Sequence, residues 1–265
     1  MSATPVSLLQ LRILTTGANR GIGFSIIQAL GTHLPDALFL LGCRSQEAGE
    51  EAVKDLRKRW SDAGIDGDGR KVEVLVLDVS DDKAIERARS EVERRWGGLD
   101  VLINNAGIAI PYGTGKGDLS ELRLSFNTTM NTNVTSIAAV TEAFLPLLHA
   151  SSIDLPKIIN ISSGRASLAR SSSGTMAPTM VVSYSISKAA VNALTIEMQK
   201  SERGTVDVYC VNPGFCSTAF NGFKGTKDPL LGAEVVVRLI LAERGIYRPG
   251  VFWEFEDGEM REVPW

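Results

Sequence analysis

Short runs of almost continuously apolar residues recur along the chain, with longer amphipathic stretches between them. Runs of this length and composition are typical of strands that are covered on both faces of a sheet. We predict strands over residues 12–16, 37–42, 72–77, 101–104, 157–161 and 206–211. A turn signal, Pro249-Gly250, precedes one more apolar run, so a last strand is expected over residues 251–255.

The stretches between these runs have the spacing of apolar residues that is expected for helices. They cover residues 22–30, 46–62, 82–96, 185–201 and 231–243, and a long helical stretch lies within residues 119–148. Strands that alternate with helices form a parallel sheet with helices on both faces and right-handed crossovers. The sequence therefore predicts a single doubly wound α/β domain of the Rossmann type over residues 1–265, with about seven parallel strands.

The composition is that of an ordinary globular protein, and it narrows the function classes. Of the 265 residues, 44% are hydrophobic and 22% are charged, and the formal net charge is -3 with acids and bases mixed along the chain. Nucleic-acid binding is not expected, because such a surface needs a basic stripe. No apolar run reaches the roughly 18 residues that a membrane span needs. Residues 1–10 lack the features of a signal peptide.

The pattern of cysteines and histidines indicates a reducing compartment. The three cysteines, Cys43, Cys210 and Cys216, form no Cys-x-x-Cys pair, and His33 and His149 are far apart in the sequence. Neither a disulfide framework nor a metal site is expected from such a pattern. We therefore expect a cytoplasmic protein.

A glycine-rich turn joins the first predicted strand to the first predicted helix. It reads Thr-Gly-Ala-Asn-Arg-Gly-Ile-Gly over residues 16–23. Glycines let the backbone approach a pyrophosphate closely, and the N–H groups at the start of the helix receive its negative charge. The position of the turn favours a dinucleotide site over a tight turn without a ligand. Its predicted cofactor contacts are Gly17, Asn19, Arg20, Gly21, Ile22 and Gly23.

The end of the second predicted strand indicates which dinucleotide is bound. NAD-dependent enzymes usually place an acid there to hold the ribose hydroxyls, but this strand ends in Cys43-Arg44-Ser45. The guanidinium of Arg44 can bind a 2′-phosphate, because its fork of donors matches the phosphate oxygens. Arg20 lies in the glycine-rich turn itself. The two arginines favour NADP(H) over NAD(H); the alternative is that Arg44 only lies at the top of the second helix.

Several further segments, in order along the chain, resemble motifs of the short-chain dehydrogenase/reductase family. Leu77-Asp78-Val79 resembles the segment that holds the adenine, and Asn104-Asn105-Ala106-Gly107 resembles a segment that lines the cofactor. Asp100 matches an acid that the family uses to brace that strand. Asn212-Pro213-Gly214, followed by Thr218, resembles the loop on the nicotinamide side. The resemblance implies cofactor contacts from Asp78, Val79, Asn105, Ala106, Gly107, Pro213, Gly214 and Thr218.

The same resemblance implies a catalytic group made of Asn133, Ser163, Tyr184 and Lys188, in which Tyr184 and Lys188 also contact the cofactor. A free tyrosine, with a pKa of about 10, is a poor base near neutral pH, and a nearby positive charge lowers that pKa. Lys188 lies four residues after Tyr184 on a predicted helix, so both side chains project from one face.

The roles of Ser163 and Asn133, and a second role of Lys188, are expected from the chemistry of carbonyl reduction and from the family resemblance. Ser163 is expected to hold and polarise the carbonyl oxygen, with Ser162 as the reserve. The family implies that Asn133 holds a water that links Lys188 to solvent, and that Lys188 hydrogen-bonds the nicotinamide ribose. The alternative for Asn133 is a helix-internal cap or bend.

Within the family, the chain resembles the carbonyl-reductase-like branch through residues 17–24, Cys43-Arg44 and residues 225–234. The gap between Ser163 and Tyr184 is longer than in compact members and shorter than in members with a long insertion. We expect the extra residues, within 165–182, to reshape the substrate entrance. A long insertion is linked to a monomer in this branch, whereas many family members form a homodimer or homotetramer, so both states stay open.

Aromatic and aliphatic residues that follow the cofactor segments are expected to form the walls of the substrate pocket, unless they pack in the core. They are Ile108, Tyr112, Phe215, Phe220 and Phe223. Such walls suit a small and fairly apolar carbonyl compound. Residues 215–229 are a candidate mobile lid, and the loops 111–118 and 170–179 are candidates for the border of the ligand crevice.

The sequence thus predicts an NADPH-dependent oxidoreductase that reduces a ketone, aldehyde or quinone to an alcohol. We expect residues 1–150 to form about the cofactor half and residues 151–265 the catalytic and substrate half. One alternative is a biosynthetic enzyme on the same fold that acts on an imine or a cyclisation substrate. Another is a non-catalytic NADPH sensor, against which the retained serine, tyrosine and lysine argue.

Overall fold

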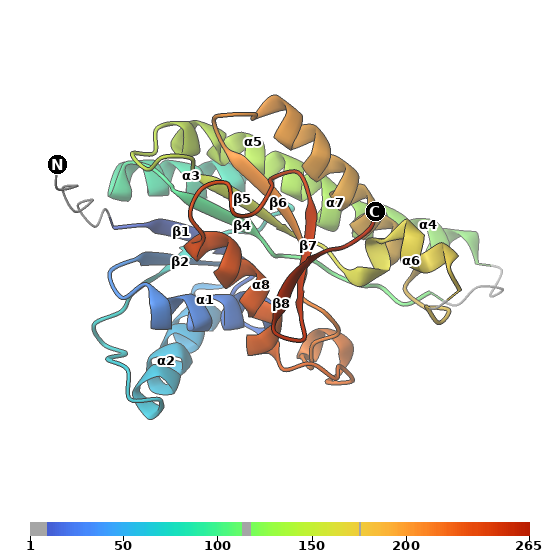
Figure 1. Ribbon diagram of the computed structural model, residues 1–265, viewed down its shortest axis with the longest axis horizontal. Coiled ribbons are helices and arrows are strands. Elements are labelled where there is room, and N and C mark those ends of the chain that lie inside the picture. Colours follow the sequence, from blue (N-terminus) through green and yellow to red (C-terminus); the bar gives the residue numbers. More distant parts are fainter. Residues whose placement is uncertain (1–9, 113–117, 175) are drawn as a thin grey trace.

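The structure is a computed structural model that describes residues 10–112, 118–174 and 176–265. Within these residues, eight strands form one sheet in the order β3-β2-β1-β4-β5-β6-β7-β8 (Figure 1). The strands are β1 (Arg12–Thr16), β2 (Leu38–Cys43), β3 (Lys71–Val76), β4 (Val101–Asn104), β5 (Lys157–Ile161), β6 (Asp207–Asn212), β7 (Phe252–Glu256) and β8 (Glu259–Glu262). Strands β1 to β7 pair in parallel, which confirms the predicted doubly wound α/β domain.

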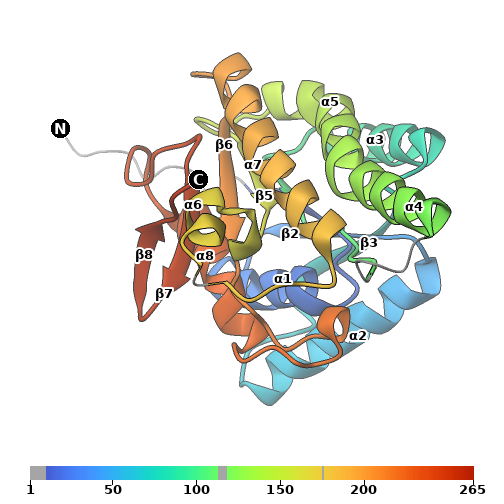
Figure 2. The ribbon, with the colours of Figure 1, turned by 90° about the vertical axis from the view of Figure 1, so that its right-hand side faces the viewer.

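Helices cover both faces of this sheet (Figures 1 and 2). On one face lie α1 (Gly21–His33), α2 (Gln46–Asp62) and α8 (Pro229–Leu241). On the other lie α3 (Asp82–Trp96), α5 (Ser136–His149) and α7 (Val182–Ser201), with α4 (Leu119–Met130) leading into α5. Short helices, η2 (Gly164–Ala166), α6 (Leu168–Ser172) and η3 (Ala219–Asn221), follow β5 and β6.

The two cores on either side of the sheet explain the continuous apolar runs. Side chains alternate between the faces of a strand. Ile13 therefore packs into the core under α1, α2 and α8, and its neighbour Leu14 packs into the core under α3 and α5. A strand that is buried on both faces needs mostly apolar residues, although buried polar side chains such as Thr16 and Asn160 also lie in these strands. This requirement accounts for the coincidence of β1, β4 and β5 with the predicted ranges 12–16, 101–104 and 157–161.

The last strand, β8, was not predicted, and it makes the sheet mixed instead of wholly parallel. It pairs antiparallel with β7, with Glu256 opposite Glu259. The turn between them is Asp257-Gly258, and both residues have positive φ, at 51° and 83°. Two such residues form the hairpin turn that matches the twist of the strands. The Asp-Gly pair was therefore a usable signal, but β8 itself is exposed and mostly charged and shows no apolar run.

The long helical stretch within residues 119–148 contains a π turn that the sequence did not reveal. Helix α4 continues through the π turn Asn131–Thr135 into α5. Such turns insert an extra residue into a helix and occur often at functional sites. Here the turn contains Asn133, whose side chain is fully buried.

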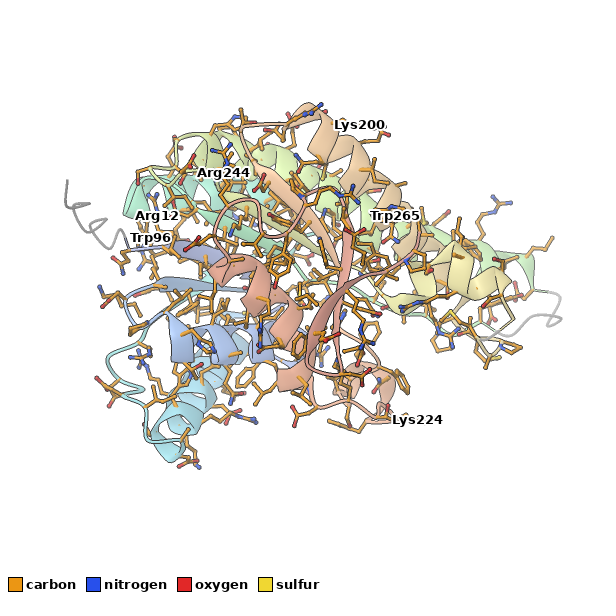
Figure 3. All side chains as sticks on the ribbon, in the orientation of Figure 1. Arg12, Trp96, Lys200, Lys224, Arg244 and Trp265 are labelled. Atoms are coloured by element: carbon orange, nitrogen blue, oxygen red, sulfur yellow. The ribbon has the colours of Figure 1, made fainter. Side chains whose placement is uncertain are left out.

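The sheet order reverses between β1 and β4, which are the first strands of the two half-sheets. In open α/β sheets the ligand crevice lies at the carboxyl ends of the strands at such a reversal. At the opposite ends of these strands, Asp100 accepts hydrogen bonds from the Arg12 backbone N–H at 2.7 Å and from Arg12 Nη2 at 2.8 Å. Figure 3 shows Arg12 beside Trp96, whose carbonyl oxygen accepts from Arg12 Nη1 at 3.0 Å. This arrangement joins β1 to the start of β4.

Some expectations fall on parts of the chain outside the described residues. They concern residues 1–9 of the N-terminal segment that we expect not to be a signal peptide, residues 113–117 of the candidate crevice loop 111–118, and residue 175 of the loop 170–179. Among the residues that the structure does describe, no helix combines the length and the apolar character that crossing a membrane requires.

Candidate functional site

The glycine-rich turn lies at the carboxyl end of β1 and leads into α1. Gly17 and Gly21 both have a φ of 61°, in the left-handed region that favours glycine. A Cβ atom on Gly17 would lie 2.9 Å from Ala106 Cα, and one on Gly23 would lie 2.5 Å from Asn105 Nδ2. Glycine is therefore required at these positions for the close contact between this turn and the segment after β4. The first turn of α1 carries no acidic residue, so its N–H groups can receive an anion.

The segment after β4 is held against this turn by two side chains. Thr16 Oγ1 accepts from the backbone N–H groups of Asn105 and Ala106, both at 3.0 Å. In return, Asn105 Nδ2 donates to the carbonyl oxygens of Thr16 at 2.8 Å and Gly17 at 3.1 Å. The structure thus brings together the predicted cofactor segments 16–23 and 104–107 at the reversal between β1 and β4.

A cation and an acid lie near each other just after β2 and β3. Burial acts to raise the pKa of Asp78, but hydrogen bonds from Ser80 and, to a smaller extent, the charge of Arg44 lower it below its ordinary value. Within the described residues, neither Arg44 nor Arg20 makes a side-chain hydrogen bond or an ion pair, and both residues are exposed. Two guanidinium groups are therefore available to a ligand, Arg20 at the start of α1 and Arg44 after β2.

Tyr184 and Ser163 meet at the carboxyl end of β5. Ser163 follows β5, and Tyr184 lies in the first turn of α7. Burial raises the pKa of Tyr184, while a hydrogen bond with the Ser163 side chain and the charge of Arg165 act in the opposite direction. The ring of Phe220 lies against that of Tyr184, with centroids 5.6 Å apart. A hydroxyl pair of this kind can hold a carbonyl oxygen between two donors.

The neighbouring Ser162 has a different environment. Its hydroxyl is buried and donates to Asn192 Oδ1 at 2.6 Å, beneath α7. Ser163 instead is half-buried, and its Oγ accepts from the Arg165 backbone N–H at 3.3 Å. Of the two serines, only Ser163 is thus placed beside Tyr184.

Lys188 lies one turn after Tyr184 on α7, as the spacing predicted. Its side chain is buried, and Nζ lies 5.8 Å from the centre of the Tyr184 ring. Nζ donates to the carbonyl oxygen of Ile161 at 2.6 Å. Burial lowers the pKa of Lys188 to about 8, because the charged form loses its hydration.

Asn133 is clamped between two elements by its side-chain amide. Oδ1 accepts from the Ile108 N–H at 2.8 Å, and Nδ2 donates to the Ile108 carbonyl oxygen at 2.9 Å. Nδ2 also donates to Ser187 Oγ at 2.9 Å, on α7. A Cβ atom on Gly107 would lie 3.2 Å from Asn133 Oδ1 and 3.7 Å from Lys188 Nζ. Both polar groups therefore border the same point beside Gly107.

The predicted nicotinamide-side loop follows β6. Asn212 Oδ1 accepts from the N–H groups of Gly164, at 2.8 Å, and Gly214, at 3.0 Å. One side chain thus joins the loop that follows Ser163 to the loop of Pro213 and Gly214. Thr218 is buried and faces the glycine-rich turn, since a Cβ on Gly21 would lie 3.8 Å from Thr218 Cβ.

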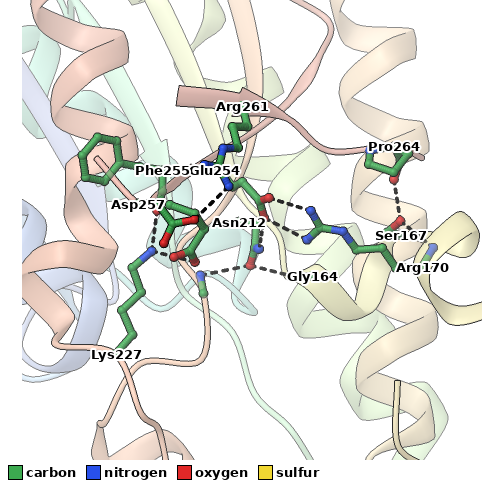
Figure 4. A network of polar contacts seen from close by, with 12 residues as sticks. Gly164, Ser167, Arg170, Asn212, Lys227, Glu254, Phe255, Asp257, Arg261 and Pro264 are labelled. Carbon is green, nitrogen blue, oxygen red and sulfur yellow. Dashed lines mark hydrogen bonds and ion pairs between the residues drawn. The ribbon is translucent and has the colours of Figure 1, made fainter. Parts of the chain in front are cut away.

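Sequence reasoning missed a polar network behind this loop (Figure 4). Glu254 on β7 is buried and accepts from Asn212 Nδ2 at 2.9 Å and from Arg170 Nη1 at 2.8 Å. Arg170 belongs to α6, within the residues that separate Ser163 from Tyr184. The backbone N–H of Ala169 donates to the carbonyl oxygen of Trp265, whose ring stacks on Phe252. The extra residues before Tyr184 therefore pack against the C-terminal strands.

The expected pocket walls do not all lie together. Phe220 contacts Tyr184, and the backbone of Tyr112 pairs with that of Met180 at 2.7 Å, beside α7. Phe215 instead lines a groove with Leu231 and Phe255, between α8 and the β7–β8 hairpin. The candidate lid 215–229 begins and ends in a bridge between Cys216 and Lys227. This bridge brings the two ends of the segment together.

Comparison with known proteins agrees with this arrangement. The family described as short chain dehydrogenase matches residues 12–228. A short-chain dehydrogenase/reductase of Aspergillus fumigatus is 39% identical and covers 96% of this chain and 97% of its own length. The NADPH-bound carbonyl reductase from chicken fatty liver has a similar structure, with a TM-score of 0.77 and 27% identity over 97% of this chain and 100% of its own.

A second solved structure, the carbonyl reductase Sniffer of D. melanogaster, has a TM-score of 0.77 and 25% identity over 97% of this chain and 100% of its own. The family match covers most of the chain, and it includes the glycine-rich turn, the segment after β4 and the pair Tyr184 and Lys188. The chain is therefore an oxidoreductase that belongs to the short-chain dehydrogenase/reductase family.

Proposed function

We propose that this protein uses NADPH to reduce the carbonyl group of a small ketone, aldehyde or quinone to an alcohol. The observation that carries the proposal is the meeting of Ser163, Tyr184 and Lys188 at the carboxyl end of β5, beside the crevice between β1 and β4. The similarity to NADPH-bound carbonyl reductase supports the same chemistry.

The residues of the crevice fit a dinucleotide with a 2′-phosphate. The glycine-rich turn leaves the backbone N–H groups at the start of α1 open to a pyrophosphate. Arg20 and Arg44 are exposed and lie at the turn and at the end of β2, where an acid would favour NADH. Asp78, Val79, Asn105, Ala106 and Gly107 would line the adenine side and the centre. When bound, NADPH supplies the hydride for the carbonyl carbon.

Tyr184 is proposed as the proton donor. Burial keeps the pKa of Tyr184 above its ordinary value, so its hydroxyl is protonated at neutral pH. A protonated hydroxyl beside Ser163 can donate to the carbonyl oxygen as negative charge develops there. The protonation state of the free protein therefore suits the direction of reduction.

Lys188 and Asn133 are proposed to restore the proton. With a pKa of about 8, Lys188 exchanges protons readily near neutral pH. Asn133 Oδ1 and Lys188 Nζ border the same point beside Gly107, which favours a water held between them. Because Asn133 is also bonded to Ile108 and Ser187, it positions the segment after β4 against α7.

The test follows the loss of NADPH absorbance with a panel of aromatic and aliphatic ketones, quinones and aldehydes. Tyr184→Phe removes only the hydroxyl, and we expect kcat to fall by about 10²–10⁴-fold, the usual contribution of a positioned acid. Tyr247→Phe is the matched control, because Tyr247 lies at the other end of the sheet beside Trp253. NADPH binding, followed by fluorescence, should stay unchanged in both variants.

Other outcomes would redirect the assignment. If wild type turned over no carbonyl compound yet bound NADPH, an imine or cyclisation substrate or a sensor role would replace the reductase. Cofactor choice is tested separately with Arg44→Ala. We expect weaker binding of NADPH by about tenfold or more and no change for NADH, since only the former carries the phosphate.

A further inference from the structure

Arg165 is a cation next to the proposed acid, and the mechanism above gives it no role. It lies in η2, two residues after Ser163, and its backbone N–H donates to Ser163 Oγ at 3.3 Å. Its side chain reaches across the extra residues, where Nη1 donates to the carbonyl oxygen of Ala177 at 3.3 Å. Ala177 lies on the segment that returns to Tyr184. The Arg165 side chain therefore connects the segment that follows Ser163 with the segment that precedes Tyr184.

The charge of Arg165 is not neutralised by the protein within the described residues. No carboxylate there forms an ion pair with it, and its one side-chain hydrogen bond is to the Ala177 carbonyl oxygen. A second arginine of the same insertion, Arg170, shows the contrast, because it pairs with Glu254. A guanidinium has five N–H donors, and its planar fork fits a carboxylate. Most of the donors of Arg165 are thus open to a ligand.

The attachment of Arg165 to Ser163 places its charge near the reaction site, since its backbone N–H donates to Ser163 Oγ. Of the charged side chains described, Arg165 is the one whose charge lowers the pKa of Tyr184. Lys188 Nζ, by comparison, is bonded to the carbonyl oxygen of Ile161. A compound whose carbonyl oxygen is held by Ser163 and Tyr184 would therefore lie near the segment that carries Arg165.

An aromatic side chain also lies against Tyr184. Phe220 tilts over the Tyr184 ring and is 52% exposed, so its face is available to a ligand. Met180 is 58% exposed and lies beside Tyr112, on the segment that precedes Tyr184. A ligand with an apolar body against Phe220 and a negative group toward Arg165 matches the chemistry of these two side chains.

We propose that the substrate is a ketone or aldehyde that also carries a carboxylate, and that Arg165 binds this carboxylate. The inference rests on the proposed function, because Ser163 and Tyr184 hold the carbonyl oxygen in both. It narrows the expectation of a fairly apolar carbonyl compound to one whose apolar body ends in one anionic group.

The test uses pairs of compounds that differ only in charge. Benzoylformate and 3-benzoylpropionate place the carboxylate at two distances from the ketone, and their methyl esters are the neutral partners. We expect wild type to prefer one acid over its ester in kcat/KM. Arg165→Met should lower kcat/KM for that acid by about 100-fold, within the range of a charged hydrogen-bonded pair. The ester should change less than about threefold, and Arg165→Lys should restore part of the loss.

The control is Arg203→Met, which removes an exposed arginine at the far end of α7. An equal loss for acid and ester in Arg165→Met would overturn the proposal, as would a wild type that prefers every ester. A shift in the pH profile of both compounds would mean that Arg165 only adjusts the pKa of Tyr184.

A binding measurement separates this inference from the proposed function. Calorimetry of the same acids and esters with the NADP⁺-loaded protein reports the carboxylate contact without turnover. Acid binding that needs Arg165, with no reduction of any compound, would keep the carboxylate site and overturn the reductase. Reduction of the esters that does not depend on Arg165, with no binding of the acids through Arg165, would keep the reductase and overturn the carboxylate site.

Discussion

Two adjacent threonines of β1 should respond in opposite ways to replacement by valine. Thr15 and Thr16 are both buried, at 0% and 2% exposed. Among the residues described, Thr15 Oγ1 has no hydrogen-bond partner, whereas Thr16 Oγ1 accepts from the N–H groups of Asn105 and Ala106. Valine has nearly the shape of threonine, so each substitution removes a hydroxyl and changes little else.

The magnitudes follow from which polar groups are left without partners. Thr16→Val leaves two backbone N–H groups unpaired, at about 1–3 kcal/mol for each buried group. Asn105 and Ala106 are only half-buried, so water relieves part of this cost, and we expect a loss of about 2–4 kcal/mol in the free energy of unfolding. Thr15→Val removes a hydroxyl whose burial without a partner is unfavourable, so stability should stay equal or rise by about 1 kcal/mol.

The assay is urea unfolding of both variants, with the slope m compared to ensure that the same transition is observed. Thr16→Val should also weaken NADPH binding by about tenfold, because the segment after β4 loses its attachment to the glycine-rich turn. Thr16→Ser keeps the hydroxyl and is the control. Equal losses in the two valine variants, or a larger loss in Thr15→Val, would refute the hydrogen-bond argument.

Three further predictions concern single side chains. Gly23→Ala should abolish NADPH binding in a fluorescence titration while the helical circular dichroism stays, because its Cβ would lie 2.5 Å from Asn105 Nδ2; normal binding would contradict this. In the folded protein Lys188 has a pKa of about 8, below its ordinary value of 10.5, so between these pH values the unfolded chain binds more protons. The free energy of unfolding of wild type should therefore rise by about 3 kcal/mol from pH 8 to 10.5, relative to that of Lys188→Met. Parallel urea midpoints across this range would refute that. Glu254→Ala should cost about 2–4 kcal/mol in urea unfolding, since Arg170 and Asn212 lose a shared buried partner; a loss below that of a surface substitution would contradict it.

Most of the fold could be predicted because its signals are local. The helices over residues 46–62 and 82–96 coincide with α2 and α3, and each begins at a side chain that caps it, Ser45 and Asp81. The buried strands carry their own apolar signal. In contrast, the π turn at Asn133 keeps the helical apolar pattern on both sides, so the periodicity could not reveal it.

The candidate site was predictable to the extent that its residues lie in contiguous motifs. Tyr184 and Lys188 share one helix, and the glycine-rich turn is one segment. The network of Arg170, Glu254 and Asn212 joins residues as much as 84 positions apart, and no single segment carries that pairing. Phe215 follows a cofactor motif, yet its side chain lines the groove beside Phe255, because the chain order after Gly214 does not fix which way a side chain points.

The contact between α6 and the chain's final residues bears on how substrate preference could evolve. Ser167 Oγ donates to the Pro264 carbonyl oxygen, and Ala169 N–H to that of Trp265, while Arg170 pairs with Glu254. A different sequence between Ser163 and Tyr184 would leave these partners unmatched. Residues 164–181, the expected border of the substrate entrance, and the terminal hairpin should therefore be inherited together. Grafting residues 164–181 alone into a relative should disturb the host, whereas grafting them together with residues 252–265 should carry the entrance intact.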